Sequence, residues 1–178
     1  NGADEYKTPT LDRLAEQGMR FTNAFSNPVC TPSRVKLITG KSNIRNYVAF
    51  ARLDRGERTF AHILKQAGYA TAIAGKWQLG SEADAPQHFG FDQALLWQHT
   101  RPRTKAGTEF DSRNSQPWFE LNGVEVNYGE GVFGPDVMSD FIKANKQRPF
   151  IAYYPMLLTH CPFVPTPDSP DWDPAPTS

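Results

Sequence analysis

Residues 30–40 have the sequence Cys-Thr-Pro-Ser-Arg-Val-Lys-Leu-Ile-Thr-Gly, which predicts a short helix with a reactive group at its start. Thr31 is of a residue type that caps helices, and Pro32 suits the first helical position, where its missing N–H is no loss. Ser33 to Thr39 then form the helix, and Gly40 ends it. The residue patterns on both sides of this stretch predict alternating helices and strands.

The thiol and the guanidinium of this stretch indicate an anion site. A helix that begins here directs free N–H groups and the positive end of its dipole at Cys30, which favours a bound anion. Arg34 lies one turn further along, and its planar fork can hold an anionic group through two hydrogen bonds. The alternative interpretation is a buried structural cysteine followed by a surface arginine.

A second stretch, Gly68 to Trp77, has the sequence GYATAIAGKW. It predicts a helix that ends at Gly68, then a strand from Tyr69 to about Ala74 that places Lys76 at its carboxyl end. Ligand sites in open α/β sheets lie at such ends. The alternative for Lys76 is a solvated surface lysine, which is the commoner fate of lysine.

A third polar group follows the apolar run Phe150 to Tyr154, which predicts a strand. Beyond it comes Thr159-His160-Cys161-Pro162. Histidine titrates near neutral pH, so His160 is a candidate proton donor. A loop histidine bonded to backbone is the alternative. The other histidines have no comparable context and are interpreted as structural or surface residues; they are His62, His88 and His99.

Together the three stretches resemble the sulfatase family. Residues 30–40 match its C-x-P-S-R-x-x-L-x-T-G signature, residues 68–77 match the start of G-Y-x-T-x-x-x-G-K-W-H-L-G, and His160 matches its H-x-P element. The resemblance implies that Cys30 is oxidised to formylglycine, whose hydrate attacks the sulfur of a sulfate monoester. It also implies that Arg34 polarises the hydrate and that Lys76 and His160 neutralise charge on the sulfuryl oxygens and the leaving group.

One position departs from the family pattern. Where the family generally carries histidine after Lys-Trp, this chain has Gln78. Glutamine can donate or accept a hydrogen bond but cannot carry a proton at neutral pH. Gln78 is therefore a candidate for positioning the substrate, and the acid role falls to another group.

The resemblance also implies a cofactor, partners and a location. Sulfatases bind a divalent cation, usually calcium, and Cys30 as formylglycine is the one ligand expected from this chain, since Asp4 and Glu5 precede the first helix outside any apolar strand. Expected partners are a sulfated small molecule or sulfated carbohydrate and the maturation enzyme that generates formylglycine. Family members usually work in the periplasm, outside the cell or in lysosomes.

Alternating helices and strands predict α/β layers with a mainly parallel sheet, and the resemblance implies the alkaline-phosphatase-like sandwich with helices on both faces. We expect residues 1–178 to be part of one catalytic domain, without its first strand and its C-terminal half, and to have little activity alone. Seven of the fifteen prolines fall within residues 155–178, so residues 157–178 are predicted to form a proline-rich surface loop.

Further elements follow from residue patterns. Helices are expected after the Thr8-Pro9, Thr59 and Pro135 starts, strands at 19–25 and 94–97, and a hairpin at 118–126 around Asn122-Gly123. Residues 98–117 are charged and irregular. We expect them to form a solvated loop, with contact to an anionic substrate as the alternative for three cations in it: Arg101, Arg103 and Lys105.

Composition excludes several classes of function. The chain carries 19 acidic and 19 basic residues, so its charge gives no case for nucleic acid or an acidic membrane surface as partner. No run of about 18 apolar residues is present, which excludes a transmembrane segment within these residues.

Three alternatives to the sulfatase interpretation stay open. The first is a hydrolase of the same superfold that acts on phosphate or phosphonate esters, although the nucleophile there is normally threonine or serine. The second is a non-catalytic module in which Cys30 stays a thiol. The third is a disulfide between Cys30 and Cys161, which would block the aldehyde chemistry and leave the Pro-Ser-Arg pattern unexplained.

Overall fold

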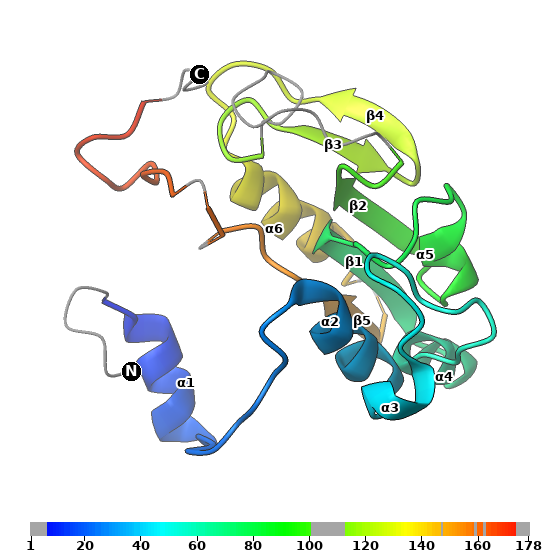
Figure 1. Cartoon of the computed structure of the whole chain (residues 1–178). Coiled ribbons are helices and arrows are strands. Elements are labelled where there is room, and N and C mark those ends of the chain that lie inside the picture. Colours follow the sequence, from blue (N-terminus) through cyan, green and yellow to red (C-terminus); the bar gives the residue numbers. More distant parts are fainter. Residues whose placement is uncertain (1–6, 101–112, 147, 159, 162, 174–178) are drawn as a thin grey trace.

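The computed structural model describes residues 7–100, 113–146, 148–158, 160–161 and 163–173. Helices and strands alternate along the chain, as predicted (Figure 1). The helices are α1 (Pro9–Gln17), α2 (Cys30–Thr39), α3 (Asn43–Asn46), α4 (Phe60–Gln66), α5 (Ala85–His88) and α6 (Gly134–Ala144). The strands are β1 (Ala70–Lys76), β2 (Gln93–Trp97), β3 (Trp118–Leu121), β4 (Val124–Asn127) and β5 (Phe150–Tyr153).

The five strands form one mixed sheet in the order β4-β3-β2-β1-β5. Strand β1 pairs in parallel with β2 on one side and with β5 on the other. The β3–β4 hairpin extends the sheet antiparallel beyond β2. Its turn is the predicted Asn122-Gly123 pair, and both residues have positive φ, 51° and 84°, as the tight hairpin turn requires.

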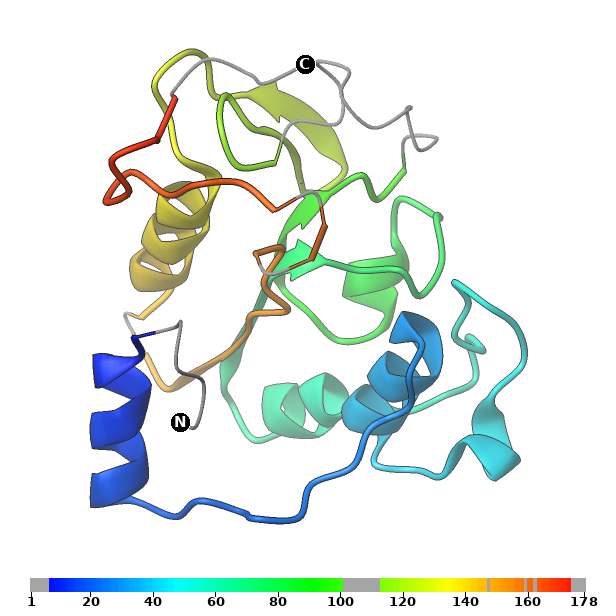
Figure 2. The same ribbon diagram turned by 60° about the vertical axis from the view of Figure 1, so that its left-hand side comes forward.

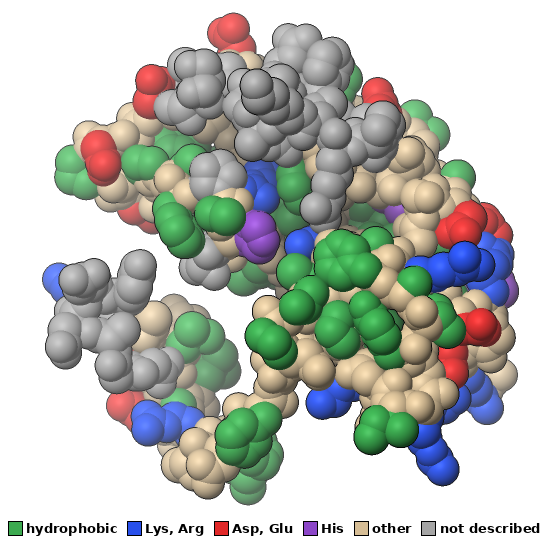
Figure 3. Space-filling view, in the orientation of Figure 1, with side chains coloured by type: hydrophobic (Ala, Val, Ile, Leu, Met, Phe, Trp, Pro, Cys, Tyr) green, Lys and Arg blue, Asp and Glu red, His purple; other side chains and the backbone are tan. Residues whose placement is uncertain are grey.

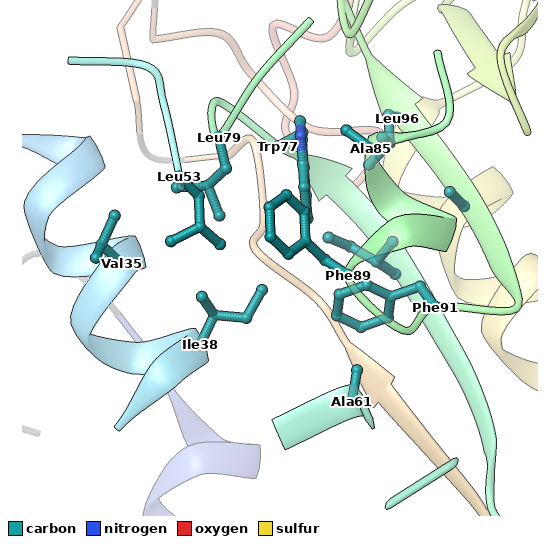
Figure 4. Packing of buried hydrophobic residues seen from close by; sticks show 12 residues of the cluster. Val35, Ile38, Leu53, Ala61, Trp77, Leu79, Ala85, Phe89, Phe91 and Leu96 are labelled. Atoms are coloured by element: carbon teal, nitrogen blue, oxygen red, sulfur yellow. The ribbon is translucent and has the colours of Figure 1, made fainter. Parts of the chain in front are cut away.

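Two apolar layers cover the two faces of the sheet. Alternate residues of β1 point to opposite faces, so Ile73 joins one cluster and Ala74 the other. On the first face the sheet packs against α2, α4 and α5, and Figure 4 shows Val35 and Ile38 of α2 facing Trp77 and the phenylalanines across this core. On the second face lies α6, which places Met138 against the sheet (Figures 1 and 2).

The ends of the helices are stabilised by capping residues that the sequence predicts. Thr59 accepts a hydrogen bond from the His62 N–H, while the His62 ring bonds back to the Thr59 N–H, which completes a capping box at α4. Gly40 ends α2 in the left-handed conformation with φ 67°, as predicted. Pro135 lies in the first turn of α6.

Two predictions of local structure are wrong. Helix α2 begins at Cys30 with Val29 at the N-cap, not after Thr31, because the Thr31 hydroxyl accepts a hydrogen bond from the Ala51 N–H instead of capping the helix. Residues 19–25 form no strand. Among the described residues no strand lies beside this segment, and Phe21 is 74% exposed, so β propensity alone is not sufficient.

The N-terminal part of the described chain stands apart from the sheet. Helix α1 has no buried residue, and an extended segment joins it to α2 (Figures 1 and 2). Some residues considered in the sequence lie outside the described ranges: Asp4, Glu5, Arg101, Arg103, Lys105, Thr159 and Pro162. No helix within the described ranges combines the length and the apolar character needed to cross a bilayer.

Candidate active site

A pocket of about 400 Å³ lies at the carboxyl ends of the parallel strands. Lys76 comes from the end of β1, Trp97 from the end of β2, and the segment after β5 supplies the remaining wall. The first turns of α2 close the pocket with Cys30 and Arg34. The structure thus brings four predicted site residues together in one cavity: Cys30, Arg34, Lys76 and His160.

The Thr-Pro-Ser part of the motif anchors the start of α2. The buried Thr31 hydroxyl accepts a hydrogen bond of 2.9 Å from the Ala51 N–H. The Pro32 carbonyl accepts one of 3.0 Å from the Asn43 side chain. The Ser33 hydroxyl donates to the Asn27 carbonyl at 2.9 Å. These hydrogen bonds fix the backbone on both sides of Cys30 and leave its thiol half-exposed.

Lys76 approaches the thiol directly. Its Nζ lies 3.4 Å from Cys30 Sγ. In the same place the Arg34 Nη1 donates to the Lys76 carbonyl at 2.9 Å. The guanidinium therefore holds the end of β1, and β1 holds the ammonium beside position 30. Positive charge is set in place before any ligand arrives, which is the arrangement that stabilises a developing anion.

Arg34 is largely enclosed. Burial lowers the pKa of Arg34, while Tyr153 and Cys30 counteract this shift; the group stays charged, because arginine does not lose its proton in proteins. Its Nε is buried and has no hydrogen-bond partner among the described residues. Burial raises the pKa of the Tyr153 phenol, against the effect of Arg34, so Tyr153 lines the pocket as a neutral group.

His160 lies at the exposed side of the pocket. Its Nδ1 is 2.8 Å from the Cys161 carbonyl oxygen. Because a carbonyl only accepts, Nδ1 carries the proton, and Nε2 is the nitrogen left for a ligand. Cys30 and Cys161 are both free thiols, so the structure contains no disulfide between them.

Arg113 is a pocket residue that the sequence analysis missed. It is only 6% exposed, lines the same cavity, and its guanidinium carbon lies 4.9 Å from the centre of the Trp97 ring. Its Nη2 donates to the carbonyls of His160 and Cys161. Residue 113 lies at the end of an irregular charged stretch, and no motif distinguishes it from the other cations there.

Gln78 lies in an adjoining pocket of about 350 Å³ rather than with Cys30. Lys76 and Trp97 line both cavities, and His99 lines the second. Gln78 has φ 56°, an uncommon conformation for a residue with a side chain. Three buried atoms here have no hydrogen-bond partner among the described residues: Gln78 Oε1, Trp97 Nε1 and His99 Nε2.

His99 is a second residue that the sequence analysis assigned to no site. It is 5% exposed. Burial lowers the pKa of its imidazole, and the opposing effect of Glu120 does not reverse the shift. The ring is therefore neutral at neutral pH, and suits hydrogen bonding to an uncharged polar ligand rather than to an anion.

The described residues do not form a calcium site of their own. Calcium takes six to eight oxygen ligands, and no group of three or more His, Cys, Asp or Glu side chains capable of holding a metal occurs within the described ranges. No carboxylate of the described residues lines the pocket around Cys30; besides Cys30 and Ser33, its walls are cationic, aromatic or apolar side chains and His160.

Comparison with known proteins identifies the family. Residues 1–174 match the protein-family model described as Sulfatase. The chain belongs to the sulfatase family. It is 33% identical over 172 residues to the N-acetylglucosamine-6-O-sulfatase of Bacteroides thetaiotaomicron, across 93% of this chain and 28% of that protein. It is 30% identical over 195 residues to the N-acetylgalactosamine-6-sulfatase of Homo sapiens, across 90% of this chain and 36% of that protein.

The sulfatase chain thus spans about a third of the length of these curated relatives. Among solved structures, it superposes with a TM-score of 0.73 and 30% identity on a protein in complex with its substrate D-glucosamine-2-N,6-O-disulfate, across 93% of this chain and 32% of that one. The mixed central sheet between helices is accordingly the alkaline-phosphatase-like fold, as predicted.

Proposed function

We propose that the complete protein hydrolyses sulfate monoesters, with a formylglycine derived from Cys30 as the nucleophile. The observation that carries this proposal is the single pocket that collects Cys30, Arg34, Lys76 and His160 from three segments far apart in the sequence. Family membership supports the reaction class. The sulfur of Cys30 occupies the place that the oxygens of the hydrated aldehyde would take.

The reaction follows from the groups around that position. One hydroxyl of the hydrate attacks sulfur and releases its proton to solvent, and the bond from sulfur to the alcohol oxygen breaks. Arg34 and Lys76 stabilise the charge on the sulfuryl oxygens, and His160, protonated on both nitrogens, donates the Nε2 proton to the departing oxygen. The second hydroxyl then gives its proton to the Nε2 atom that His160 has left unprotonated, the carbonyl re-forms, and sulfate leaves. Water adds to the aldehyde to restore the hydrate.

Gln78 is not part of this proton transfer, because an amide does not titrate. We place it in substrate binding, in the adjoining pocket. We include calcium binding in the proposal for the complete protein. Formylglycine at position 30 would supply one oxygen ligand, and residues outside the described ranges would supply the other oxygen ligands. We also propose that a maturation enzyme oxidises Cys30 and that the complete protein acts outside the cytoplasm.

A sulfated carbohydrate is the substrate class that the adjoining pocket favours. A sugar next to the sulfate offers hydroxyls, which both donate and accept and so suit Gln78, Trp97 and His99 there. Aromatic faces such as Trp97 also pack against sugar rings. The relatives named above act on, or bind, sulfated amino sugars. An aryl sulfate would fill the same space without satisfying these polar atoms.

The test is made on the complete protein expressed with a formylglycine-generating enzyme. Mass spectrometry of the peptide across Cys30 should show the aldehyde, and an aryl sulfate should be cleaved faster than the matching aryl phosphate. Cys30→Ala should abolish turnover, and Lys76→Ala should lower kcat by about 10²- to 10³-fold. Lys143→Ala is the matched control, since Lys143 is exposed on α6 and pairs only with Asp140 among the described residues.

Each alternative has its own signature in this experiment. A clear preference for the phosphate ester would identify a phosphate or phosphonate hydrolase of the same fold. An unmodified thiol at position 30 in the presence of the maturation enzyme, with no turnover of either ester, would identify a non-catalytic module. Either result would refute the sulfatase proposal.

A further inference from the structure

We propose that Arg113 is a positioning residue that fixes the imidazole of His160 over the pocket. The inference rests on the proposed function, in which His160 donates the proton to the leaving group. It goes beyond that function because no sequence motif marks Arg113. The geometry that carries it is a shared acceptor: Arg113 Nη2 and His160 Nδ1 both bond to the Cys161 carbonyl oxygen.

The contacts of Arg113 leave its guanidinium little freedom. One side of the group lies over the Trp97 ring, 4.9 Å from its centre. Its Nη2 donates to the Cys161 carbonyl and, at 3.4 Å, to the His160 carbonyl. The side chain is 6% exposed. A planar guanidinium can stack and donate to two carbonyls at once, whereas a lysine ammonium cannot match that geometry.

Within the described ranges, the segment that carries His160 has few other hydrogen bonds. His160 is exposed and lies seven residues beyond the end of β5, in irregular structure. Its own N–H makes only a long hydrogen bond, 3.4 Å to the Leu157 carbonyl. Because the Cys161 carbonyl orients the His160 ring through Nδ1, the group that holds this carbonyl also sets the direction of Nε2. That group is Arg113.

The backbone of Arg113 is fixed in turn by α6. Gly134 begins this helix, and a Cβ at residue 134 would lie 2.0 Å from the Arg113 carbonyl oxygen. The Gly134 N–H donates to the Asn114 carbonyl at 2.7 Å. The support therefore runs from α6 through Arg113 to the loop after β5. The hydrogen bond from Arg113 Nη2 to the His160 carbonyl joins two segments that are 47 residues apart in the sequence.

The test is a double-mutant cycle in the complete, matured protein, with Arg113→Met, His160→Ala and both changes together. Arg113→Met should lower kcat by about 10- to 100-fold, because misplacing a catalytic group by about 1 Å has an effect of that size. KM should change less than about threefold. In the double variant, kcat should equal that of His160→Ala alone within about twofold, since Arg113 then has no imidazole to position.

Hydrogen exchange supplies a readout that does not depend on turnover. In Arg113→Met, amides of residues 157–161 should exchange faster than in the wild type, while those of β1 should not change. Arg113→Lys, which keeps the charge, should show the same changes to a smaller degree and serves if the methionine variant unfolds. Arg55→Met is the matched control, because Arg55 is an exposed arginine that pairs with Asp84 away from the pocket.

Three results would overturn the inference. Additive losses in the cycle with a large rise in KM would mean that Arg113 binds the substrate itself. Unchanged kcat would mean that it only stabilises the fold. Unchanged exchange at 157–161 would mean that it does not hold this segment. A wild-type protein without sulfatase activity would instead refute the proposed function, and the exchange experiment would still decide whether Arg113 holds His160.

Discussion

Three cationic side chains line one pocket of a chain whose formal net charge is zero. Arg34, Lys76 and Arg113 come from α2, β1 and the segment before β3. Arg34 and Arg113 both donate hydrogen bonds to backbone carbonyls, which fixes their guanidinium groups at the pocket. The pocket is therefore selective for anions through local placement of charge and not through the overall charge of the molecule.

One buried carboxylate orders the edge of the second pocket. Glu120 of β3 is 1% exposed and accepts hydrogen bonds from the His99 N–H at 2.7 Å and the Thr100 hydroxyl at 2.6 Å. Burial alone would raise the pKa of Glu120, but these hydrogen bonds outweigh it, so the pKa lies below the ordinary value of 4.5.

This carboxylate predicts an acid dependence of stability. A lowered folded-state pKa gives stability that is present above the unfolded-state pKa and is lost as pH falls through the folded-state value. Glu120→Gln should lower the free energy of unfolding by about 1–3 kcal/mol at pH 7. The difference from the wild type should shrink as pH falls below about 4.5. Urea titrations from pH 7 to pH 3 measure both effects.

Glu130→Gln is the control for this titration, since Glu130 is an exposed carboxylate in the loop before α6. It should change the free energy of unfolding by less than about 0.5 kcal/mol at every pH. A constant difference between wild type and Glu120→Gln down to pH 3 would contradict the role given to Glu120.

At the residue scale the sequence predicted those side chains that sit at fixed offsets in motifs. Cys30 and Arg34 lie in the first turns of one helix, and Lys76 lies at the end of one strand. Short-range sequence patterns predict that helix and that strand, and therefore the positions of these side chains. Arg113 and His99 could not be predicted in this way. Their place depends on how the β3–β4 hairpin and the loop after β5 pack against β2, and no short-range pattern encodes that packing.

At the scale of elements, the site depends on how closely β1 meets the segment after β5. The Lys76 N–H donates to the Pro155 carbonyl at 3.0 Å. The preceding Gly75 has φ 119°, and a Cβ at that position would lie 2.3 Å from the same carbonyl oxygen. Only glycine allows the two backbones this approach, and the approach keeps Lys76 beside Cys30.

Gly75→Ala should therefore destabilise the fold through both a contact and a backbone conformation. We expect a loss of about 2–4 kcal/mol in the free energy of unfolding, since strained backbone and overpacking each cost about 1–3 kcal/mol. Gly129→Ala separates the two causes: Gly129 has φ 76° but no atom within 4 Å of a built Cβ. It should cost only about 1 kcal/mol. Equal losses for the two variants, measured by urea unfolding, would show that the Pro155 contact is unimportant.

The sequence predicted helices, strands and turns correctly where the local residue pattern and the contacts in the folded chain favour the same structure. The Asn122-Gly123 turn, the Thr59 cap and the apolar strand before Lys76 all have short-range causes, and the structure contains each of them. Residues 19–25 have the composition of a strand, but pairing needs a neighbour. The Thr31 cap failed for a related reason, since the backbone N–H of Ala51, 20 residues away in the sequence, donates its hydrogen bond to the Thr31 hydroxyl.

At the scale of the whole molecule, much apolar surface is not covered by the described residues. Figure 3 shows hydrophobic side chains gathered on the α1 side and on the face over α2 and α3. The most exposed large apolar side chains are Ile44, Phe25, Phe163, Met19 and Phe21, at 97%, 91%, 79%, 77% and 74%. Strand β5 is also an edge of the described sheet, and exposed edges and apolar patches promote association.

The 178-residue chain on its own should therefore self-associate, most strongly near pH 7, where its calculated pI of 7.1 leaves no net charge to keep molecules apart. Replacing Phe21 and Phe25 with Asp should reduce both light scattering and binding of a hydrophobic dye, because it removes apolar surface and adds charge. The free energy of unfolding should change by less than about 0.5 kcal/mol, since exposed side chains add little to the core. Lys36→Gln with Lys146→Gln makes the same change in net charge, two units more negative, at exposed positions without removing large apolar side chains. If that control suppressed association equally, charge and not the exposed phenylalanines would be the cause.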